Sequence, residues 1–428
     1  LLLLLCVSSQ LLTAQRQSYQ GYMSAGDQAV VQDDYYSAYK FYRIALEYPG
    51  KENMPDALYK LGMTAVHSRA YQVGRDALLR LNTLPEAATY PDRSYYLAES
   101  YYRTGDYDQA VIQYETFLAD NPTAEEWMRN SATTNIKDAN WAINESRSER
   151  DIVLTHLPAN VNSEYSDVAF SISPGGAEYF TSNRFKFKKD TLNPRRKLSR
   201  VMRREEANVG VALPKAINLP GKLVAHSSFN AAGNNVYFSV CEYYDYENIR
   251  CNIYRANVDG SGEWSNPKII DEINGETFTS QMPNVGLDGA TGTEYLYFSS
   301  NRDGGMGKMD IYRSLITESG EVGQPVNLED INTEGNDVTP FFYSPRNTLY
   351  FSTDGRPSYG GLDVYKSFMI SGEYRTPTNA GSPVNSSYDD AYYARYENRE
   401  SAYVSSTRQS PQAIFFDEEK EVCCYDIY

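Results

Sequence analysis

Apolar and polar residues alternate along the chain from residue 151 onward, and one short phrase recurs there. A phrase of the Tyr-Phe-Ser type appears five times, with its lead tyrosines 58, 60, 53 and 53 residues apart. The copies begin at Tyr179, Tyr237, Tyr297, Tyr350 and Tyr403. A period of two residues is typical of half-buried β-strands. A repeat of this length predicts a β-propeller, in which no single unit can bury its apolar face alone.

The third unit indicates how the strands of one blade are arranged. We expect strands at 281–285 and 294–300, a third strand ending at Tyr312, and a fourth at 325–328. The glycine-rich stretch 303–307 is interpreted as a structural turn rather than a metal loop, because glycine takes positive φ without steric cost. The predicted fold is a five-bladed propeller over 151–428, with six blades as the alternative if the long insertion of the first unit contains further strands.

The segment before the first copy resembles a fourth strand without a blade of its own. The fifth copy shows only three strands, from Asp389 to Tyr428. We therefore expect residues 152–157 to add the missing strand to that last blade. Such closure removes exposed sheet edges, which otherwise pair with other chains.

The first 150 residues have a helical period instead. Small residues recur 36 residues apart, each followed 12 residues later by a second small residue and then by a bulky one. These columns are Gly26, Gly62 and Ala98, then Ala38, Gly74 and Ala110, then Tyr42, Leu78 and Tyr114. The pattern predicts three tetratricopeptide helix pairs over 15–124, an α-solenoid, followed by a capping helix and linker over 125–150.

The N-terminal run of leucines resembles the apolar part of a secretory signal. Residues 1–14 are expected to form a signal peptide, with cleavage after Ala14. The alternative is a lipoprotein signal with Cys6 as the acylated residue, although Leu5 stands where a small residue is usual. Either signal implies export.

The charge balance bears on the kind of partner, and the cysteines bear on possible disulfides and metal sites. The chain carries 40 basic and 56 acidic residues, which argues against a nucleic-acid partner. Cys241 and Cys251 flank a predicted hairpin, and two alternatives stay open for them, a disulfide bridge and free thiols. The adjacent Cys423 and Cys424 could form only a strained ring or bonds to other partners. No spacing of Cys and His predicts zinc, and no cofactor is expected.

One basic segment interrupts this acidic chain within the first blade. It is expected between the second and third strands, either as a solvated loop or as a docking patch for an anionic polymer or acidic protein. Its candidate residues are Lys186, Lys188, Lys189, Arg195, Arg196, Lys197, Arg200 and Arg203.

Arrangements typical of catalysis are missing from the sequence. The chain has three histidines, and it contains neither a Gly-x-Ser-x-Gly elbow nor a His-Glu-x-x-His helix. Adjacent acids on a strand point to opposite faces, so paired carboxylates such as Asp389 and Asp390 do not suggest acid–base chemistry. The sequence therefore predicts a protein that is not an enzyme.

Three stretches carry a family resemblance. They are Asn301 to Tyr312, with the pattern Asn-Arg-x-Gly-Gly-x-Gly-x-x-Asp-Ile-Tyr, Gly360 to Tyr365, and Cys423 to Tyr428. These stretches resemble the WD-like propeller repeats of the TolB-related type. The order of tetratricopeptide repeats followed by these propeller repeats resembles that of exported envelope proteins of the OmpA-family group, which is associated with type IX secretion and gliding. Members usually continue into an OmpA-like peptidoglycan-binding domain, and none follows Tyr428 here: either the sequence is a fragment or wall binding is not a property of this chain.

The resemblance implies a periplasmic, outer-membrane-associated location and a role as a non-catalytic scaffold. In this interpretation the helical repeats bind envelope proteins, and the protein links outer-membrane components to peptidoglycan or another anionic polymer. The first helix of each pair is expected to line the partner groove, with Tyr22, Ala29, Tyr59, Tyr95 and Tyr102. The alternative function is a propeller that binds a glycan or muropeptide in its central channel or on its rim.

Overall fold

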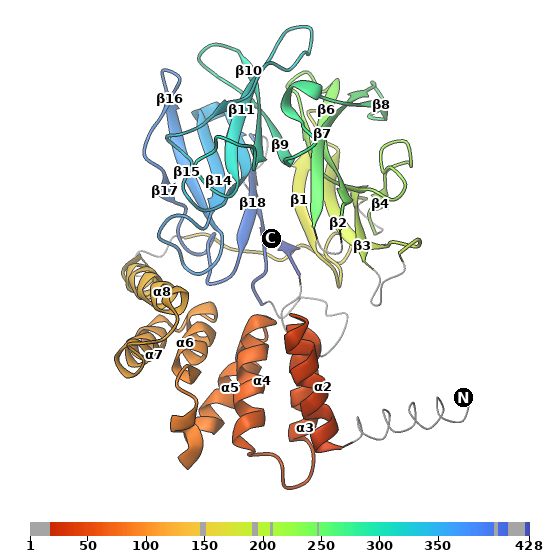
Figure 1. Cartoon of the computed structure of the whole chain (residues 1–428). Coiled ribbons are helices and arrows are strands. Elements are labelled where there is room, and N and C mark those ends of the chain that lie inside the picture. The colour runs from red at the N-terminus through yellow and green to blue at the C-terminus, as the bar shows by residue number, and fades with distance from the viewer. Residues whose placement is uncertain are drawn as a thin grey trace, which may run out of the picture. The chain divides into compact units, whose positions relative to one another are not determined.

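The chain folds into two compact units, a helical one up to residue 147 and a β-unit from residue 148 (Figure 1). The computed structural model describes residues 18–145, 151–190, 196–205, 209–245, 248–397, 401–409 and 424–428. The predicted order of a helical region followed by a propeller is confirmed. The predicted signal peptide, Cys6 included, lies outside the described residues.

Residues 18–145 form seven α-helices. These are α2 (Tyr19–Val31), α3 (Tyr35–Leu46), α4 (Pro55–His67), α5 (Tyr71–Asn82), α6 (Arg93–Arg103), α7 (Tyr107–Asp120) and α8 (Glu126–Glu145). Asp34 and Asp106 begin α3 and α7 as N-caps, with side chains that accept the N–H of Ser37 and Gln109. None of these described helices is long and apolar enough to cross a bilayer.

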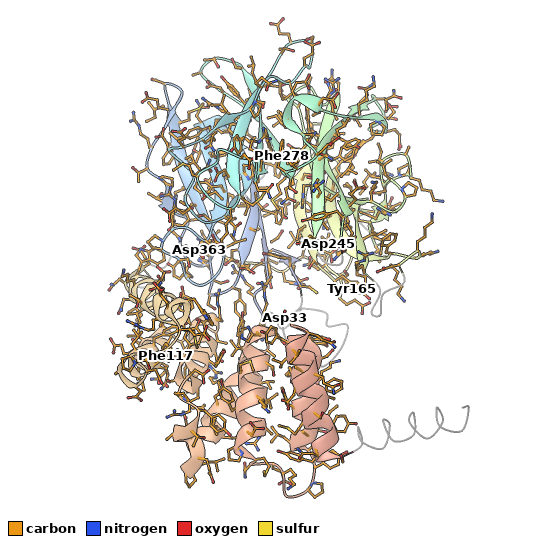
Figure 2. The ribbon with its side chains drawn as sticks, in the orientation of Figure 1. Asp33, Phe117, Tyr165, Asp245, Phe278 and Asp363 are labelled. Carbon is orange, nitrogen blue, oxygen red and sulfur yellow. A yellow bond between two sulfur atoms is a disulfide. The ribbon has the colours of Figure 1, made fainter. Side chains whose placement is uncertain are left out.

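The small residues of the helical repeat let paired helices approach closely. A Cβ added at Gly26 would lie 2.4 Å from the ring of Tyr42, and one at Gly62 would lie 2.5 Å from Leu78. Phe117, on α7, is fully buried in this unit (Figure 2). Helix α8 buries Met128 and small alanines rather than Trp127, which is half exposed. Assignment of the helix pairs to the tetratricopeptide class stays a prediction.

The described residues from 151 onward form five β-sheets, so the six-bladed alternative is set aside. Blade 1 contains β1 (Asp167–Ile172), β2 (Glu178–Lys186), β3 (Lys197–Arg203) and β4 (Val211–Ala212). Blade 2 contains β5 (Leu223–Phe229), β6 (Asn235–Tyr243), β7 (Ile249–Val258) and β8 (Trp264–Ile269). Blade 3 contains β9 (Ser280–Leu287), β10 (Glu294–Ser300), β11 (Asp310–Ile316) and β12 (Val326–Asn327).

Blade 4 contains β13 (Asp337–Tyr343), β14 (Thr348–Thr353), β15 (Asp363–Ile370), β16 (Glu373–Tyr374) and β17 (Thr378–Asn379). Blade 5 contains β18 (Asp390–Arg395), β19 (Ala402–Ser406) and β20 (Asp426–Ile427). The inner strands β1, β5, β9, β13 and β18 contact one another in that order, and β18 returns to β1. These five strands therefore surround a central channel.

The Asp-Ile-Tyr phrase begins the third strand of a blade, whereas we expected it at the end. Strand β11 starts at Asp310, and its Ile311 exchanges hydrogen bonds with the side-chain amide of Asn332, which lies in the loop leading to the next blade. The same two bonds, of 2.8–3.0 Å, recur in every blade. The pairs are Asn162–Ile427, Asn218–Val201, Asn274–Ile253, Asn332–Ile311 and Asn385–Val364.

The last blade closes in a less regular way than predicted. Residues 152–157 form no strand, and within this segment His156 and Leu157 contact β20. The N–H of Leu157 donates to the oxygen of Ile427 at 2.9 Å, while Val153 is 87% exposed. The predicted strand is therefore corrected to an irregular segment, and hydrogen bonds at Leu157, Asn162 and Asp167 join this end of the β-unit to residues 425–427.

Candidate functional site

Each inner strand of the propeller carries one non-glycine residue in the left-handed region. The register of each strand shifts at this place, as in a β-bulge. The residues, with φ from 52° to 58°, are Ala169, His226, Met282, Thr339 and Tyr392. Such backbone is uncommon outside glycine, and for a β-branched residue such as Thr339 it is an outlier. It costs roughly 1–3 kcal/mol per residue and clusters at functional sites.

The hydroxyls of the repeated Tyr-Phe-Ser phrase hold three of these five residues. In each case the backbone N–H at the bulge donates to a Ser or Thr hydroxyl of the preceding blade. The bonds run from Ala169 to Ser405 at 3.3 Å, from His226 to Thr181 at 2.9 Å and from Met282 to Ser239 at 3.0 Å. The third position of the phrase thus fastens one blade to the next.

A cavity of about 220 Å³ occupies the channel and begins at these five residues. Its walls follow each inner strand from the bulge toward the carboxyl end. The lining ranges are 169–172, 226–229, 282–285, 339–345 and 392–397. We call Ala169, His226, Met282, Thr339 and Tyr392 the floor of this cavity.

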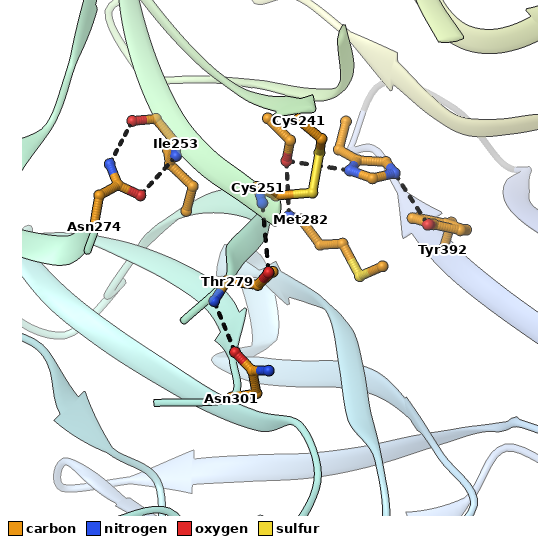
Figure 3. Close-up of a disulfide and its surroundings, with 10 residues drawn as sticks. Cys241, Cys251, Ile253, Asn274, Thr279, Met282, Asn301 and Tyr392 are labelled. Atoms are coloured by element: carbon orange, nitrogen blue, oxygen red, sulfur yellow. Dashed lines mark hydrogen bonds between the residues drawn. A yellow bond between two sulfur atoms is a disulfide. The ribbon is translucent and has the colours of Figure 1, made fainter. Parts of the chain in front are cut away.

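The floor contains a chain of hydrogen-bonding side chains across the channel. The Nε2 of His226 lies 3.0 Å from the Oη of Tyr392, and its Nδ1 lies 3.2 Å from the Oγ of Ser239. The two rings are stacked, with centroids 5.2 Å apart. Figure 3 shows Tyr392 and Met282 at this place. The chain joins blades 2 and 5 across the channel.

Burial sets the protonation of this pair. Burial lowers the pKa of His226 to about 3, so the imidazole is neutral at physiological pH. Burial also raises the pKa of Tyr392, whose hydroxyl therefore keeps its proton. Neither group brings a charge to the floor.

Aromatic and charged side chains lie farther along the walls, at the carboxyl ends of β13 and β18. Phe341 and Tyr396 pack edge to face at 5.8 Å, and the guanidinium of Arg395 lies 5.5 Å from the ring centroid of Tyr343. Among the described lining residues Glu397 is the one carboxylate. The described residues also hold no group of three or more His, Cys, Asp or Glu side chains that could bind a metal.

A second cavity, of about 560 Å³, lies in the fifth blade, and Tyr393 and Arg395 line both this cavity and the channel cavity. Residues 151–155 and 401–404 line it, together with Tyr428. It belongs to the irregular closure of that blade.

The predicted partner groove is not open at most of its residues. Ala29, Tyr95 and Tyr102 are buried in the core between the helices, so they cannot line a surface groove. Tyr22 and Tyr59 are half-buried, and the hydroxyl of Tyr59 donates to Asp92 at 2.7 Å. The small spacing between the helices, which the repeat requires, places these rings inside the unit.

The predicted basic patch is also smaller than expected. Lys186, Lys188 and Lys189 are exposed, and Arg195 lies outside the described residues. Strand β3 includes three of the remaining cations. All four remaining cations have partners within the protein: Arg196 with Asp190 at 3.1 Å, Lys197 over the ring of Tyr165 at 4.0 Å, Arg200 with the oxygen of Lys222, and Arg203 with Glu205 and Glu263 at 3.8 Å. Anion docking stays a prediction for the three exposed lysines.

Cys241 and Cys251 form a disulfide between β6 and β7 (Figure 3). They are directly opposed in the ladder of the two strands. The backbone N–H of Cys251 lies 3.4 Å from the hydroxyl of Thr279, which leads into β9. The bridge lies two residues from Ser239, whose hydroxyl contacts His226. Cys423 lies outside the described residues.

No protein-family profile matches the sequence, and no curated protein matches it. Among solved structures it is similar to an α-L-arabinofuranosidase from Clostridium thermocellum, at 12% identity and a TM-score of 0.36, over 61% of this chain and 93% of that one. It is also similar to sucrose-6-phosphate hydrolase from Lactobacillus gasseri, at 11% identity and a TM-score of 0.40, over 62% and 57%. A puromycin-hydrolysing peptidase of Mycobacterium tuberculosis matches at 15% identity and a TM-score of 0.33, over 59% of this chain and 36% of that one.

Two predictions from the sequence stand against these comparisons. The sequence predicts a scaffold without enzymatic activity, whereas the similar structures are glycoside hydrolases and a peptidase, so neither prediction is carried further. The comparisons also give no support to the expected tetratricopeptide, OmpA or type IX secretion relationship. At such low identity and TM-score, the likeness transfers no substrate or mechanism to this chain.

Sequence reasoning missed the floor of the channel. Its five residues are chemically dissimilar, and they share a backbone conformation rather than a side chain. The available signal was their position, because four of them lie 10 or 11 residues upstream of a Tyr-Phe-Ser phrase and Met282 lies 15 residues upstream.

Proposed function

We propose that the channel cavity binds one neutral sugar ring of a glycan. The observation that carries this proposal is a cavity whose uncharged floor includes the polar residues His226, Thr339 and Tyr392, with aromatic side chains along its walls. Pockets of this kind, apolar and aromatic with a few fixed polar groups, are the usual binding sites of small ligands.

The size of the cavity supports a single ring. Its volume of about 220 Å³ is below the roughly 300–1,000 Å³ of pockets that hold drug-sized ligands. A longer oligosaccharide would have to extend out of the cavity, past Tyr343 and Arg395, which line it. The proposed ligand is therefore a terminal sugar.

The rigidity of the wall supports the same proposal. Ser171 and Ser227 bond to each other across blades 1 and 2 at 2.8 Å, and Asn284 accepts the N–H of Phe342 at 2.8 Å across blades 3 and 4. These bonds fix the inner strands before any ligand arrives. Preorganised polar groups reduce the entropy that binding costs.

An exported location forms part of this proposal. The Cys241–Cys251 disulfide supports it, because disulfides persist in oxidising compartments and are rare in the cytosol. An exported propeller would meet envelope glycans and muropeptides.

Ligand-observed NMR on the full chain tests the proposal with neutral monosaccharides, uronic acids and muropeptide fragments. We expect saturable binding of a neutral sugar, weakened roughly fivefold or more by Tyr343→Ala, because an aromatic contact contributes about 1 kcal/mol. Tyr244→Ala is the matched control, since Tyr244 is 56% exposed and does not line the cavity. Absence of sugar binding up to roughly 10 mM, a concentration that detects even weak ligands, would overturn the proposal.

The same samples report on catalysis. Each sugar that binds is presented as its oligosaccharide, and release of reducing ends is followed over time. Hydrolysis that Tyr343→Ala lowers together with binding would extend the proposal to an enzyme acting at this cavity. An equal loss of binding in Tyr343→Ala and Tyr244→Ala would count against the site.

A further inference from the structure

The hydrogen-bonding chain on the floor leaves one group able to meet a ligand. The Oγ of Ser239 accepts the N–H of Met282 at 3.0 Å and also contacts the Nδ1 of His226. The Nε2 of His226 contacts the Oη of Tyr392. Ser239 is fully buried, whereas Tyr392 lines the cavity. These hydrogen bonds therefore end at Tyr392, a residue that lines the cavity.

A neutral imidazole has one N–H, so the hydrogen bonds from Ser239 through His226 to Tyr392 have two possible arrangements. In the first, Ser239 donates to Nδ1 and the Nε2–H of His226 donates to Tyr392, whose own O–H then points to a third group. In the second, Tyr392 donates to Nε2 and the Nδ1–H donates to Ser239, so the Oη of Tyr392 offers a lone pair to a third group. The tautomer of His226 thus decides whether Tyr392 donates or accepts.

We propose that the Oη of Tyr392, directed by His226, recognises a hydroxyl group of the bound sugar and selects neutral sugars over anionic ones. The inference rests on the proposed function. A sugar hydroxyl both donates and accepts, so either arrangement of the chain can bond to it.

The backbone around Tyr392 fixes the position of this hydroxyl. The N–H of Tyr392 lies 3.3 Å from the hydroxyl of Thr339, which in turn lies 3.1 Å from Ser352. The ring of Tyr392 also stacks on His226. Contacts to blades 2 and 4 thus hold the residue before a ligand binds.

Selection against anions follows from the charge of the floor. None of the five described floor residues is charged at neutral pH, because His226 is neutral and the other four are Ala169, Met282, Thr339 and Tyr392. A carboxylate moved there from water would lose hydration without gaining a countercharge, which costs several kcal/mol. Arg395 lies farther out along the wall, beside Tyr343. A carboxylate on the ligand is therefore expected to point away from the floor.

The test is a double comparison by isothermal titration calorimetry with the full chain. Tyr392→Phe keeps the ring and removes the hydroxyl, and each protein is titrated with the sugar identified above, its monodeoxy analogues and its uronic acid. We expect Tyr392→Phe to bind the parent sugar roughly tenfold more weakly, since one hydrogen bond contributes about 1.4 kcal/mol. One deoxy analogue should bind both proteins equally, because it lacks the recognised hydroxyl. Tyr350→Phe is the matched control, since Tyr350 lies on β14 and does not line the cavity.

The outcomes separate this inference from the proposed function. If the unmodified chain binds no sugar, the proposed function fails. If it binds the sugar and Tyr392→Phe binds it equally well, the site stands and the role of Tyr392 is wrong. Equal affinity of the unmodified chain for the sugar and its uronic acid would refute the selection against anions.

Discussion

The side-chain amide of Asn162 forms two hydrogen bonds with the backbone of Ile427, 265 residues away. Its Nδ2 donates to the oxygen of Ile427 at 2.9 Å, and its Oδ1 accepts the N–H at 2.8 Å. The other four blades form the same pair between residues 17 to 21 apart, as Asn218–Val201 and Asn332–Ile311 illustrate. The pair of hydrogen bonds that is local within the other blades therefore also closes the ring between Asn162 and Ile427.

Replacing Asn162 tests this closure. Asn162→Ala should lower the free energy of unfolding by about 2–4 kcal/mol, because two buried backbone groups lose their partner. Asn218→Ala is the matched control, since it removes equivalent bonds within blade 1. Both variants should be destabilised in urea, but only Asn162→Ala should make the β-unit more sensitive to protease at residues 151–166. Equal sensitivity of the two variants would show that Asn162 has no special part in closure.

His156 takes the place in blade 5 that an asparagine takes in blades 3 and 4. It contacts Asp426 at 2.9 Å, as Asn327 contacts Asp310 at 2.9 Å and Asn379 contacts Asp363 at 2.6 Å. His156→Asn should therefore change the stability by less than about 1 kcal/mol, while His156→Ala should cost about 1–3 kcal/mol. Urea unfolding of both variants measures the difference. The equivalence of these positions would be wrong if both substitutions cost the same.

The neutral His226 predicts a pH dependence of stability. Its pKa is about 3 in the folded protein and about 6.5 in the unfolded chain, so the unfolded state binds more protons between these values. Stability is then lost as the pH falls from about 6.5 toward 3, by at most about 1.4 kcal/mol per pH unit. His226→Asn should reduce this slope while tolerating the left-handed backbone. An unchanged slope would place the protonation elsewhere.

The Cys241–Cys251 disulfide should stabilise the propeller. Changing both cysteines to serine is expected to lower the free energy of unfolding by about 2–3 kcal/mol, because the bridge restricts the unfolded chain. Thermal unfolding with and without a reductant measures the effect, and the reductant should leave the double variant unchanged. Equal stability of the oxidised protein and the double variant would refute this contribution.

The sequence revealed the blades because their shared residues are chemical repeats. Tyr297 and Phe298 recur at one register of the second strand, and Asp310 recurs at the start of the third. The fastening asparagines repeat as well, yet the function of Asn332 is not visible without its partner Ile311. Repeated side chains could be predicted, and their pairing across long separations could not.

The floor of the channel and the fate of the basic segment show the limit of such reasoning. Thr339 and Met282 share only a left-handed backbone conformation. The bulges of the strands impose this conformation, and the residue types do not predict it. The sequence suggested that the guanidinium of Arg196 could bind an anionic partner, but the fold brings Asp190 within 3.1 Å of it. Tyr102 looked like a surface aromatic, yet the close helix spacing buries it.

A crystal structure of the full chain soaked with the sugar selected by NMR would show where that sugar binds. One sugar ring is expected in the channel cavity, with a hydroxyl within about 3.2 Å of the Oη of Tyr392. A sugar bound on the rim, in the cavity of the fifth blade or on the helical unit, with the channel unchanged, would contradict this expectation.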